Sequence, residues 1–294
     1  RYMNYKFNYM ELNKIYNEPC LTTLSKMPND FLDCVITSPP YWQLRDYGYD
    51  GQWGLEPTFQ EYLEHLWSMM DEIKRVLKPS GTVWINLGDT YNTVSGGIRG
   101  LERAKKYNSS KSISKKNIIG QGFQQIKSED IQSKCLLLIP HRFAIGCIDR
   151  GWIIRNDIIW AKRNGMPESV TDRFSKKHEY FFFMTKSEKY HFDLDSIRDK
   201  HKDVLLERIK YGWKSSHDSI GEIDTDEMGD RFCNPKGKNP GSVSDFWDIP
   251  TKPNKEQHYA QYSDELIKKP ILAGCPEDGI IYDPFMGSGS TAEA

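Results

Sequence analysis

The order of secondary-structure signals in the first half of the chain constrains the fold more than any other feature. Residues 33–37 are a short apolar run ended by two prolines, which predicts a buried strand followed by a loop. A capping box begins at Thr58, and apolar residues recur at helical spacing behind it, up to Leu77. We expect the Pro-Ser-Gly sequence at residues 79–81 to end that helix and residues 82–87 to form the next strand. A strand, a crossover helix and a second strand in this order predict parallel neighbours in a three-layer α/β fold.

The rest of the chain alternates regular and irregular stretches. A helix is predicted over residues 140–149, and strands are predicted over residues 152–160 and 179–185. Residues 92–130 differ because Ser, Gly, Asn and Lys dominate them, and a loop of this length is usually functional or disordered. A further irregular stretch separates these elements from a last ordered segment, residues 244–294.

Composition excludes several classes of protein. The 294 residues include 40 Lys and Arg against 41 Asp and Glu, which rules out a uniformly basic nucleic-acid coat but not a locally basic segment. No apolar stretch approaches the roughly 20 residues of a membrane-spanning helix, so no membrane partner is expected. The six cysteines form no C-x-x-C pair, which predicts no metal site. Because the sequence opens on no secretory leader, we expect a reduced, cytoplasmic location.

A glycine-containing turn is the first candidate for chemistry. Residues 283–291 are Asp-Pro-Phe-Met-Gly-Ser-Gly-Ser-Thr and follow a strand-like segment, residues 279–282. Gly287 and Gly289 would let the backbone approach a ligand at the carboxyl end of a strand, where open α/β sheets bind cofactors. The turn lacks the third glycine of a dinucleotide loop and the Gly-Lys-Ser/Thr of a phosphate loop, which disfavours nicotinamide and ATP. A tight strand-to-helix turn without a ligand is the alternative.

The second candidate is the sequence Thr-Ser-Pro-Pro-Tyr-Trp at residues 37–42, directly after the first predicted strand. Two consecutive prolines stiffen the backbone and have no N–H, so the carbonyl groups there are expected to be free to accept hydrogen bonds. The Ser38 hydroxyl and the aromatic faces of Tyr41 and Trp42 complete a set that suits a flat ring with an exocyclic amine. A proline-terminated strand with core aromatics is the alternative.

Together the two segments resemble the amino-group DNA methyltransferases, and most closely those that methylate N4 of cytosine. Residues 38–41 match the catalytic motif Ser/Asp/Asn-Pro-Pro-Tyr/Phe/Trp, and residues 283–289 match the S-adenosylmethionine loop. The catalytic motif precedes the cofactor loop, as in the permuted β group. The resemblance implies a circularly permuted, Rossmann-like α/β sheet with a less regular target-recognition region. It divides the chain into a catalytic part at 10–190 that includes the basic loop 92–130, a target-recognition region at 191–243, and a cofactor-binding part of the same domain at 244–294.

The resemblance also implies roles for individual residues. The catalytic residues would be Ser38, Pro39, Pro40 and Tyr41, with Tyr41 stacking on a flipped-out base. The cofactor-binding residues would be Asp283, Pro284, Phe285, Gly287, Ser288, Gly289 and Thr291, with Tyr262 and Ser263 in a flanking helix. Phosphates of double-stranded DNA would contact the basic residues of segment 99–116, which are Arg99, Arg103, Lys105, Lys106, Lys111, Lys115 and Lys116. Lys162, Arg163, Arg173, Lys176 and Lys177 are further candidates for phosphate contacts.

Two positions depart from the family pattern. Pro19 stands where the family commonly has an Asp that contacts the cofactor, and Glu18 is the candidate substitute. The strand with the ribose-binding acid would follow Ala294, so we expect the site to be incomplete there or completed by another subunit. A cognate restriction endonuclease and a second copy of the chain are the candidate protein partners.

Two alternative functions remain open at this point. The first is methylation of N6 of adenine, although adenine enzymes usually have Asp or Asn where this chain has Ser38. The second is a non-catalytic DNA-binding protein. The residue that accepts the proton released by the target amine is not identified by the sequence.

Overall fold

The chain folds around one mixed β-sheet. The computed structural model describes residues 10–93, 128–165, 168–198, 244–251, 264–287 and 289–294. Within them six strands form a sheet of order β5-β3-β4-β2-β1-β6. The strands are β1 Leu32–Thr37, β2 Leu77–Leu87, β3 Ile153–Ala161, β4 His178–Thr185, β5 Phe246–Asp248 and β6 Ile281–Tyr282. β1 pairs in parallel with β2 and β6, β3 pairs in parallel with β5, and β4 is antiparallel to β2 and β3. Every described strand except β4 therefore runs in one direction.

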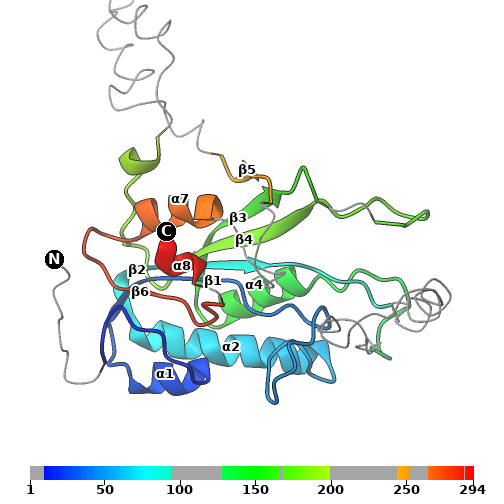
Figure 1. Cartoon of the computed structure of the whole chain (residues 1–294), viewed down its shortest axis with the longest axis horizontal. Coiled ribbons are helices and arrows are strands. Elements are labelled where there is room, and N and C mark those ends of the chain that lie inside the picture. The colour runs from blue at the N-terminus through cyan, green and yellow to red at the C-terminus, as the bar shows by residue number, and fades with distance from the viewer. Residues whose placement is uncertain (1–9, 94–127, 166–167, 199–243, 252–263, 288) are drawn as a thin grey trace, which may run out of the picture.

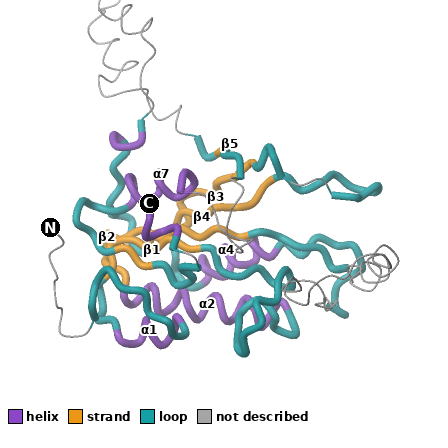
Figure 2. Tube along the Cα trace, viewed as in Figure 1, coloured by secondary structure: helices purple, strands orange, loops and turns teal. Residues whose placement is uncertain are grey.

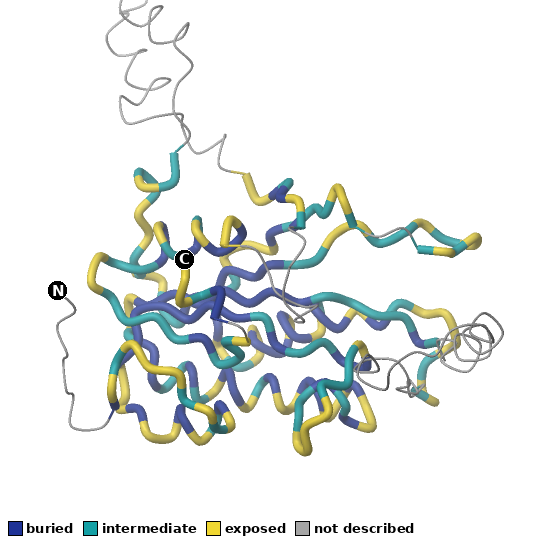
Figure 3. Tube along the Cα trace, viewed as in Figure 1, coloured by how far each residue is buried: buried dark blue, intermediate teal, exposed yellow. Residues whose placement is uncertain are grey.

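Helices cover both faces of the sheet, as Figures 1 and 2 show. The described helices are α1 Cys20–Lys26, α2 Phe59–Val76, α4 Ile139–Asp149, α7 Asp264–Gly274, α8 Ser290–Glu293 and the 3₁₀ turn η2 Asp195–Ile197. α1, α2 and α4 pack on one face, and α7 packs on the other (Figure 1). Figure 3 shows that the central strands are buried between these two layers. The predicted three-layer α/β class is confirmed.

The helix α2 forms where the sequence pattern predicts it. The Thr58 hydroxyl accepts a hydrogen bond from the backbone N–H of Glu61 at 3.2 Å, which satisfies one of the free amides at the helix start. The apolar face behind this cap is buried against the sheet, with Tyr62, Leu66 and Ile73 among the fully buried side chains. Burial of that face is the main stabilising contribution to such a helix.

The predicted end of this helix was wrong. Leu77 has extended backbone angles, φ −73° and ψ 135°, so the helix stops at Val76 and β2 begins at Leu77. Leu77 pairs with Leu32 in the neighbouring strand, and the ladder resumes at Thr82 after an irregularity. The Pro-Ser-Gly sequence therefore lies within an irregular part of β2 rather than between two elements. The predicted elements at 33–37, 140–149, 152–160 and 179–185 are confirmed to within one residue at each end.

Candidate active site

The carboxyl ends of three parallel strands bring the two sequence motifs to one edge of the sheet. β1 lies between β2 and β6, so residues that follow these strands are neighbours in space. The Thr37 hydroxyl at the end of β1 donates to Oδ1 of Asp283, which follows β6, at 2.6 Å. Ser38 is the next residue after Thr37. The Ser-Pro-Pro-Tyr segment and the glycine-containing turn therefore meet although they lie at opposite ends of the sequence.

A side chain of α2 and a backbone carbonyl of the loop before it hold the Pro-Pro-Tyr-Trp sequence in place. Tyr62 of α2 is fully buried and donates its hydroxyl proton to the carbonyl of Pro40 at 2.8 Å. Trp42 is buried and donates from Nε1 to the carbonyl of Glu56 at 2.9 Å. The expectation that the carbonyls of this segment are free is therefore wrong for Pro40, whose carbonyl accepts from Tyr62. Trp42 is a core aromatic and not a free stacking surface.

A polar network surrounds the Ser38 hydroxyl. Ser38 Oγ donates to Asn86 Oδ1 at 3.3 Å, and the Tyr41 hydroxyl lies 2.9 Å from the same oxygen. The orientation of the Asn86 amide is defined because its Nδ2 donates to the carbonyl of Tyr180 at 3.1 Å. Gly88 packs directly on the Tyr41 ring, since a Cβ there would lie 2.5 Å from Cε2 of that ring. Asn86 is the residue that joins the two hydroxyl groups.

Glu179, in β4, extends this network away from Ser38. The Tyr41 hydroxyl donates to Glu179 Oε2 at 2.8 Å, and Lys162 forms an ion pair with Oε1 of the same carboxylate. Both charged side chains are about four-fifths buried, and the Lys162 ammonium also lies 4.1 Å from the centre of the Trp160 ring. Burial raises the pKa of Tyr41 well above its ordinary value, the Glu179 charge raises it further, and a hydrogen bond from Ser38 opposes this shift. Tyr41 therefore keeps its proton at neutral pH.

A second carboxyl group, Asp89, lies just beyond the end of β2. Its Oδ1 accepts backbone N–H groups of Thr90 at 2.8 Å and of Ile139 at 3.1 Å. Its Oδ2 is buried and has no hydrogen-bond partner among the described residues. Burial raises the pKa of Asp89, while the two backbone hydrogen bonds and the charge of Lys176 partly oppose the shift.

The turn after β6 is organised by Asp283, which is buried. Its Oδ1 also accepts the backbone N–H of Phe285 at 2.9 Å, and its Oδ2 accepts the Thr291 hydroxyl at 2.5 Å. Gly287 and Gly289 have positive φ angles of 57° and 99°, which side-chain-bearing residues rarely adopt. Among the described residues, no atom outside the adjoining residues lies within 4 Å of where a Gly289 Cβ would be, which leaves space beside this backbone.

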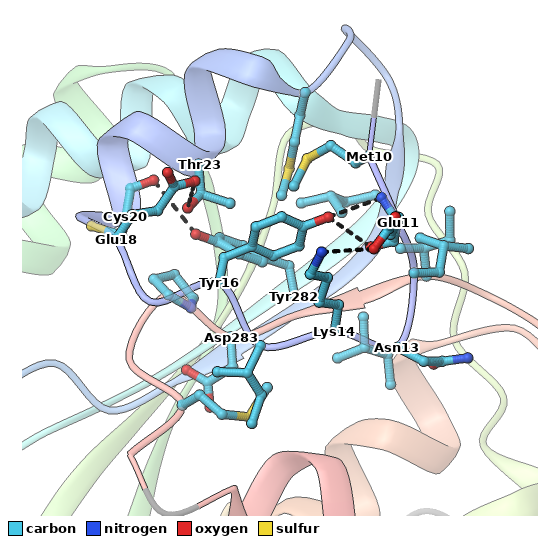
Figure 4. A pocket seen from close by; sticks show the side chains of 18 of the residues that line it. Met10, Glu11, Asn13, Lys14, Tyr16, Glu18, Cys20, Thr23, Tyr282 and Asp283 are labelled. Carbon is cyan, nitrogen blue, oxygen red and sulfur yellow. Dashed lines mark hydrogen bonds and ion pairs between the residues drawn. The ribbon is translucent and has the colours of Figure 1, made fainter. Parts of the chain in front are cut away.

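A cavity of about 270 Å³ lies between this turn and the first described segment of the chain. Figure 4 shows side chains from both segments around it. Its lining combines apolar, aromatic, polar and charged side chains with the backbone of a glycine, and includes Met10, Glu11, Lys14, Tyr16, Glu18, Thr23, Tyr282, Asp283, Pro284 and Gly287. Glu18, the expected substitute for the family Asp, lines the cavity, accepts from the Thr23 hydroxyl at 2.9 Å and pairs with Lys26 at 2.5 Å.

Several predicted site residues lie outside the described residues. These are Ser288, Tyr262, Ser263 and all seven basic residues of segment 99–116. The five basic residues at 162–177 are described and each has a local partner. Lys162 pairs with Glu179, Arg163 with Asp248 and Arg173 with Glu168, while Lys176 and Lys177 donate to the carbonyls of Asp89 and Gly165. Lys162 is about four-fifths buried and paired with Glu179, so it is a poor candidate for a phosphate contact.

Three further residues contact the Ser-Pro-Pro-Tyr segment, namely Asn86, Glu179 and Tyr62. Asn86 was open to prediction, because the segment 86–89 ends a predicted parallel strand on the same side as the two motifs and is a candidate for contact with the base or the cofactor, with a strand-end turn as the alternative. No role for Glu179 or Tyr62 in this site follows from the sequence. In the described part of the chain, no group of three or more His, Cys, Asp or Glu side chains could hold a metal ion. None of the described helices is long and apolar enough to cross a membrane.

Comparison with known proteins agrees with this geometry. The family model described as DNA methylase, which covers N6 and N4 enzymes, matches residues 32–294. The type II methyltransferase M.Cfr9I of Citrobacter freundii is 35% identical over 283 residues, which are 96% of this chain and 79% of that protein. M.SmaI of Serratia marcescens, also named a type II methyltransferase, is 33% identical over 90% of this chain and 76% of its own length.

Similarity to a solved structure shows the fold. The structure named PvuII DNA methyltransferase (cytosine-N4-specific) has a TM-score of 0.57 and 17% identity, and the match covers 94% of this chain and 75% of that one. The chain belongs to the N6/N4 DNA methylase family. It is a DNA methyltransferase, its methyl donor is S-adenosylmethionine, and the family resemblance and Rossmann-like fold predicted from the sequence are confirmed.

Proposed function

We propose that this methyltransferase modifies N4 of a flipped-out cytosine in double-stranded DNA. The observation that carries the proposal is Ser38, whose hydroxyl lies beside Asn86 and Tyr41 at the edge of the sheet that also carries the cofactor turn. In the family that the sequence resembles, enzymes that methylate adenine usually have Asp or Asn at this position. The solved structure of similar fold is itself named cytosine-N4-specific.

The described residues fit S-adenosylmethionine at the cavity beside the β6 turn. When bound, this cofactor supplies a methyl group on a positively charged sulfur. The open backbone at Gly289 admits a close ligand, and the cavity offers aromatic and apolar walls together with the charged groups Glu11, Lys14 and Glu18. We assign cofactor binding to these cavity residues and to the turn at 283–291.

Ser38 and Pro39 position the amine that receives the methyl group. The lone pair of this nitrogen is delocalised into the ring, so the amine is a poor nucleophile at rest. The Ser38 hydroxyl and the Pro39 carbonyl would accept its two hydrogens and favour a pyramidal nitrogen whose lone pair points at the methyl group. Holding the two reactants in line supplies much of the remaining rate enhancement.

Tyr41 would stack on the extruded base. Flipping a base out of the duplex costs a few kcal/mol, and stacking on an aromatic ring returns roughly 1–3 kcal/mol. The Tyr41 ring is half-buried, and its hydroxyl is held at 2.9 Å from Asn86 and 2.8 Å from Glu179. A ring fixed in this way loses little conformational freedom when the base binds.

The wider setting follows from the relatives. M.Cfr9I and M.SmaI are named type II methyltransferases. We propose that this protein likewise protects DNA against a cognate restriction endonuclease, in the cytoplasm, with the basic residues of segment 99–116 contacting phosphates. Residues 191–243 would then contribute to recognition of the target sequence.

Identification of the modified base tests the proposed function. The protein is incubated with plasmid DNA and labelled S-adenosylmethionine, the DNA is digested to nucleosides, and the labelled product is identified by mass spectrometry. We expect N4-methylcytosine at a defined sequence. N6-methyladenine would assign the enzyme to the other branch of the family, and C5-methylcytosine would contradict the amine mechanism altogether.

A further inference from the structure

We propose that Glu179 accepts the proton that the target amine releases, through the hydroxyl groups of Ser38 and Tyr41. The proposal rests on the assignment of Ser38 to the target amine, and it holds for either exocyclic amine. The hydroxyl groups of Ser38 and Tyr41 lie 3.3 and 2.9 Å from the same atom, Asn86 Oδ1, and a hydrogen bond from Ser38 acts on Tyr41. Tyr41 in turn lies 2.8 Å from Glu179 Oε2, so the two hydroxyl groups lead from Ser38 to the carboxylate.

The contacts of the Tyr41 hydroxyl with Asn86 and Glu179 can accommodate one more proton than an ionised Glu179 supplies. Tyr41 has a single hydroxyl proton, but its oxygen lies 2.9 Å from Asn86 Oδ1 and 2.8 Å from Glu179 Oε2. Both of these oxygens are acceptors when Glu179 is ionised, so Tyr41 can donate to only one of them. When Glu179 carries a proton, it donates to Tyr41 and Tyr41 donates to Asn86. Both contacts are then satisfied.

Other groups near Ser38 are poor acceptors. Asn86 is an amide and does not accept a proton at neutral pH. Asp283 already accepts three hydrogen bonds, from Thr37, Phe285 and Thr291, and it holds the cofactor turn. Asp89 contacts the backbone of Thr90 and Ile139, and no described hydrogen bond links it to Ser38 or Tyr41. Glu179 is the carboxylate that the described hydrogen bonds connect to Ser38.

Methyl transfer and proton transfer are coupled at the target nitrogen. The nitrogen lone pair forms the new C–N bond, and the electron pair of the broken S–CH₃ bond stays on sulfur. One amine proton passes to Ser38 Oγ, the Ser38 proton passes to the Tyr41 oxygen, and the Tyr41 proton passes to Glu179 Oε2. The amine ends neutral and methylated, both hydroxyl groups are regenerated, and Glu179 is left as a carboxylic acid. It returns its proton to solvent after the product leaves.

The two oxygens of the Glu179 carboxylate have different partners. Oε1 is paired with the Lys162 ammonium, and this positive charge balances a carboxylate at a position that is about four-fifths buried. Oε2 remains directed at Tyr41. The high pKa of Tyr41 keeps its proton in place until transfer begins, so no stage requires a stable tyrosinate.

The test compares Glu179→Gln and Glu179→Ala with the wild-type enzyme in single-turnover methyl transfer, using preformed complexes of enzyme, cofactor and DNA. Gln keeps the size of Glu and an oxygen that can accept from Tyr41, but it cannot take a proton. We expect Glu179→Gln to lower the single-turnover rate about 10²-fold or more, which is the usual size of a general acid–base effect. Binding of cofactor and DNA should change less than threefold. Glu188→Gln, at an exposed carboxylate after the same strand, is the matched control and should keep the wild-type rate.

Chemical rescue separates a proton acceptor from a residue that only positions Tyr41. Formate at tens of millimolar should raise the rate of Glu179→Ala at least tenfold and leave Glu179→Gln unchanged, because only the shortened side chain leaves space for a small carboxylate. A Glu179→Gln rate within threefold of wild type would overturn the proposal, and so would a Glu179→Ala variant that folds, binds DNA and does not respond to formate. The product of the wild-type reaction reports on the proposed function separately, because N6-methyladenine would refute cytosine specificity without affecting the relay.

Discussion

The carboxylate of Asp283 organises the turn at residues 283–291, which we propose binds the cofactor, and connects this turn to β1. It accepts hydrogen bonds from the Thr37 hydroxyl at 2.6 Å, the Phe285 N–H at 2.9 Å and the Thr291 hydroxyl at 2.5 Å, and it is only 6% exposed. We predict that Asp283→Asn both lowers the free energy of unfolding and weakens cofactor binding, because the same three hydrogen bonds fix the conformation of the turn.

The magnitude follows from these three bonds. Hydrogen bonds to a charged group contribute about 1.5–3 kcal/mol each and neutral ones about 0.5–1.5 kcal/mol, so losing the charge costs roughly 1 kcal/mol per bond. Asn can keep all three contacts if its amide nitrogen faces Thr291, whose hydroxyl can rotate and accept. Removing the buried charge also removes its desolvation cost, which offsets part of the loss. We therefore expect the free energy of unfolding to fall by about 1–3 kcal/mol.

Urea unfolding and calorimetric titration with S-adenosylmethionine measure the two effects. Asp278→Asn is the matched control because Asp278 is exposed and has a φ of 60°, a conformation that Asn tolerates well. If Asp283→Asn unfolds within about 0.5 kcal/mol of this control and binds cofactor normally, Asp283 does not organise the turn.

Three further outcomes are expected. Ser38→Ala should keep the fold and the affinity for cofactor but lower the single-turnover rate about 10²–10³-fold, the usual cost of losing one preorganised contact to a reacting group; an unchanged rate would remove Ser38 from the mechanism. Tyr62→Phe should lower the free energy of unfolding in urea by about 1–3 kcal/mol, since it leaves the Pro40 carbonyl without its donor; no change would mean that water replaces the hydroxyl. Asp89→Asn should stabilise the protein at pH 7.5 and have little effect at pH values below about 4. Burial raises the pKa of Asp89, so the folded state binds this proton more tightly than the unfolded state does. The free energy of unfolding that this group contributes is therefore fully present below the unfolded pKa and is lost as the pH rises through the folded pKa. An equal effect of Asp89→Asn at both pH values would contradict this reasoning.

Elements defined by local chemistry were predictable from the sequence. The helix α2 has its own cap at Thr58 and its own apolar face, and both are visible within a few residues. Its C-terminal end was not predictable, because Leu77 fits the helical spacing equally well. Pairing of Leu77 with Leu32 decides that it belongs to β2, and that contact joins residues far apart in the sequence.

Some residues of the candidate site were likewise predictable from local sequence and others were not. Ser38 and the turn at 283–291 could be found because they lie in short motifs whose residue types indicate the chemistry of the site. Asn86 could be proposed as a polar residue at the end of a predicted strand, with a simple strand-end turn as the alternative. Tyr62 of α2 and Glu179 of β4 could not be assigned to the site, because only the packing of α2 and the pairing of β2 with β4 place them around Tyr41. Glu179 gave no signal of its own because a single carboxylate near the start of an apolar strand is common on protein surfaces.

Under the function proposed above, the geometry of β1 would allow two motifs far apart in the sequence to act on one reaction. Thr37 and Ser38 are consecutive, yet Thr37 contacts Asp283 of the cofactor turn while Ser38 joins the network that would hold the target amine. Because successive residues of an extended chain point in opposite directions, one strand end can define both partners of the transfer. With the proposed site, the relative position of methyl donor and acceptor would depend on a strand whose six residues are all buried. A shift of about 1 Å in such an arrangement can cost 10²-fold in rate, so a rigid, central strand is a favourable place for this junction.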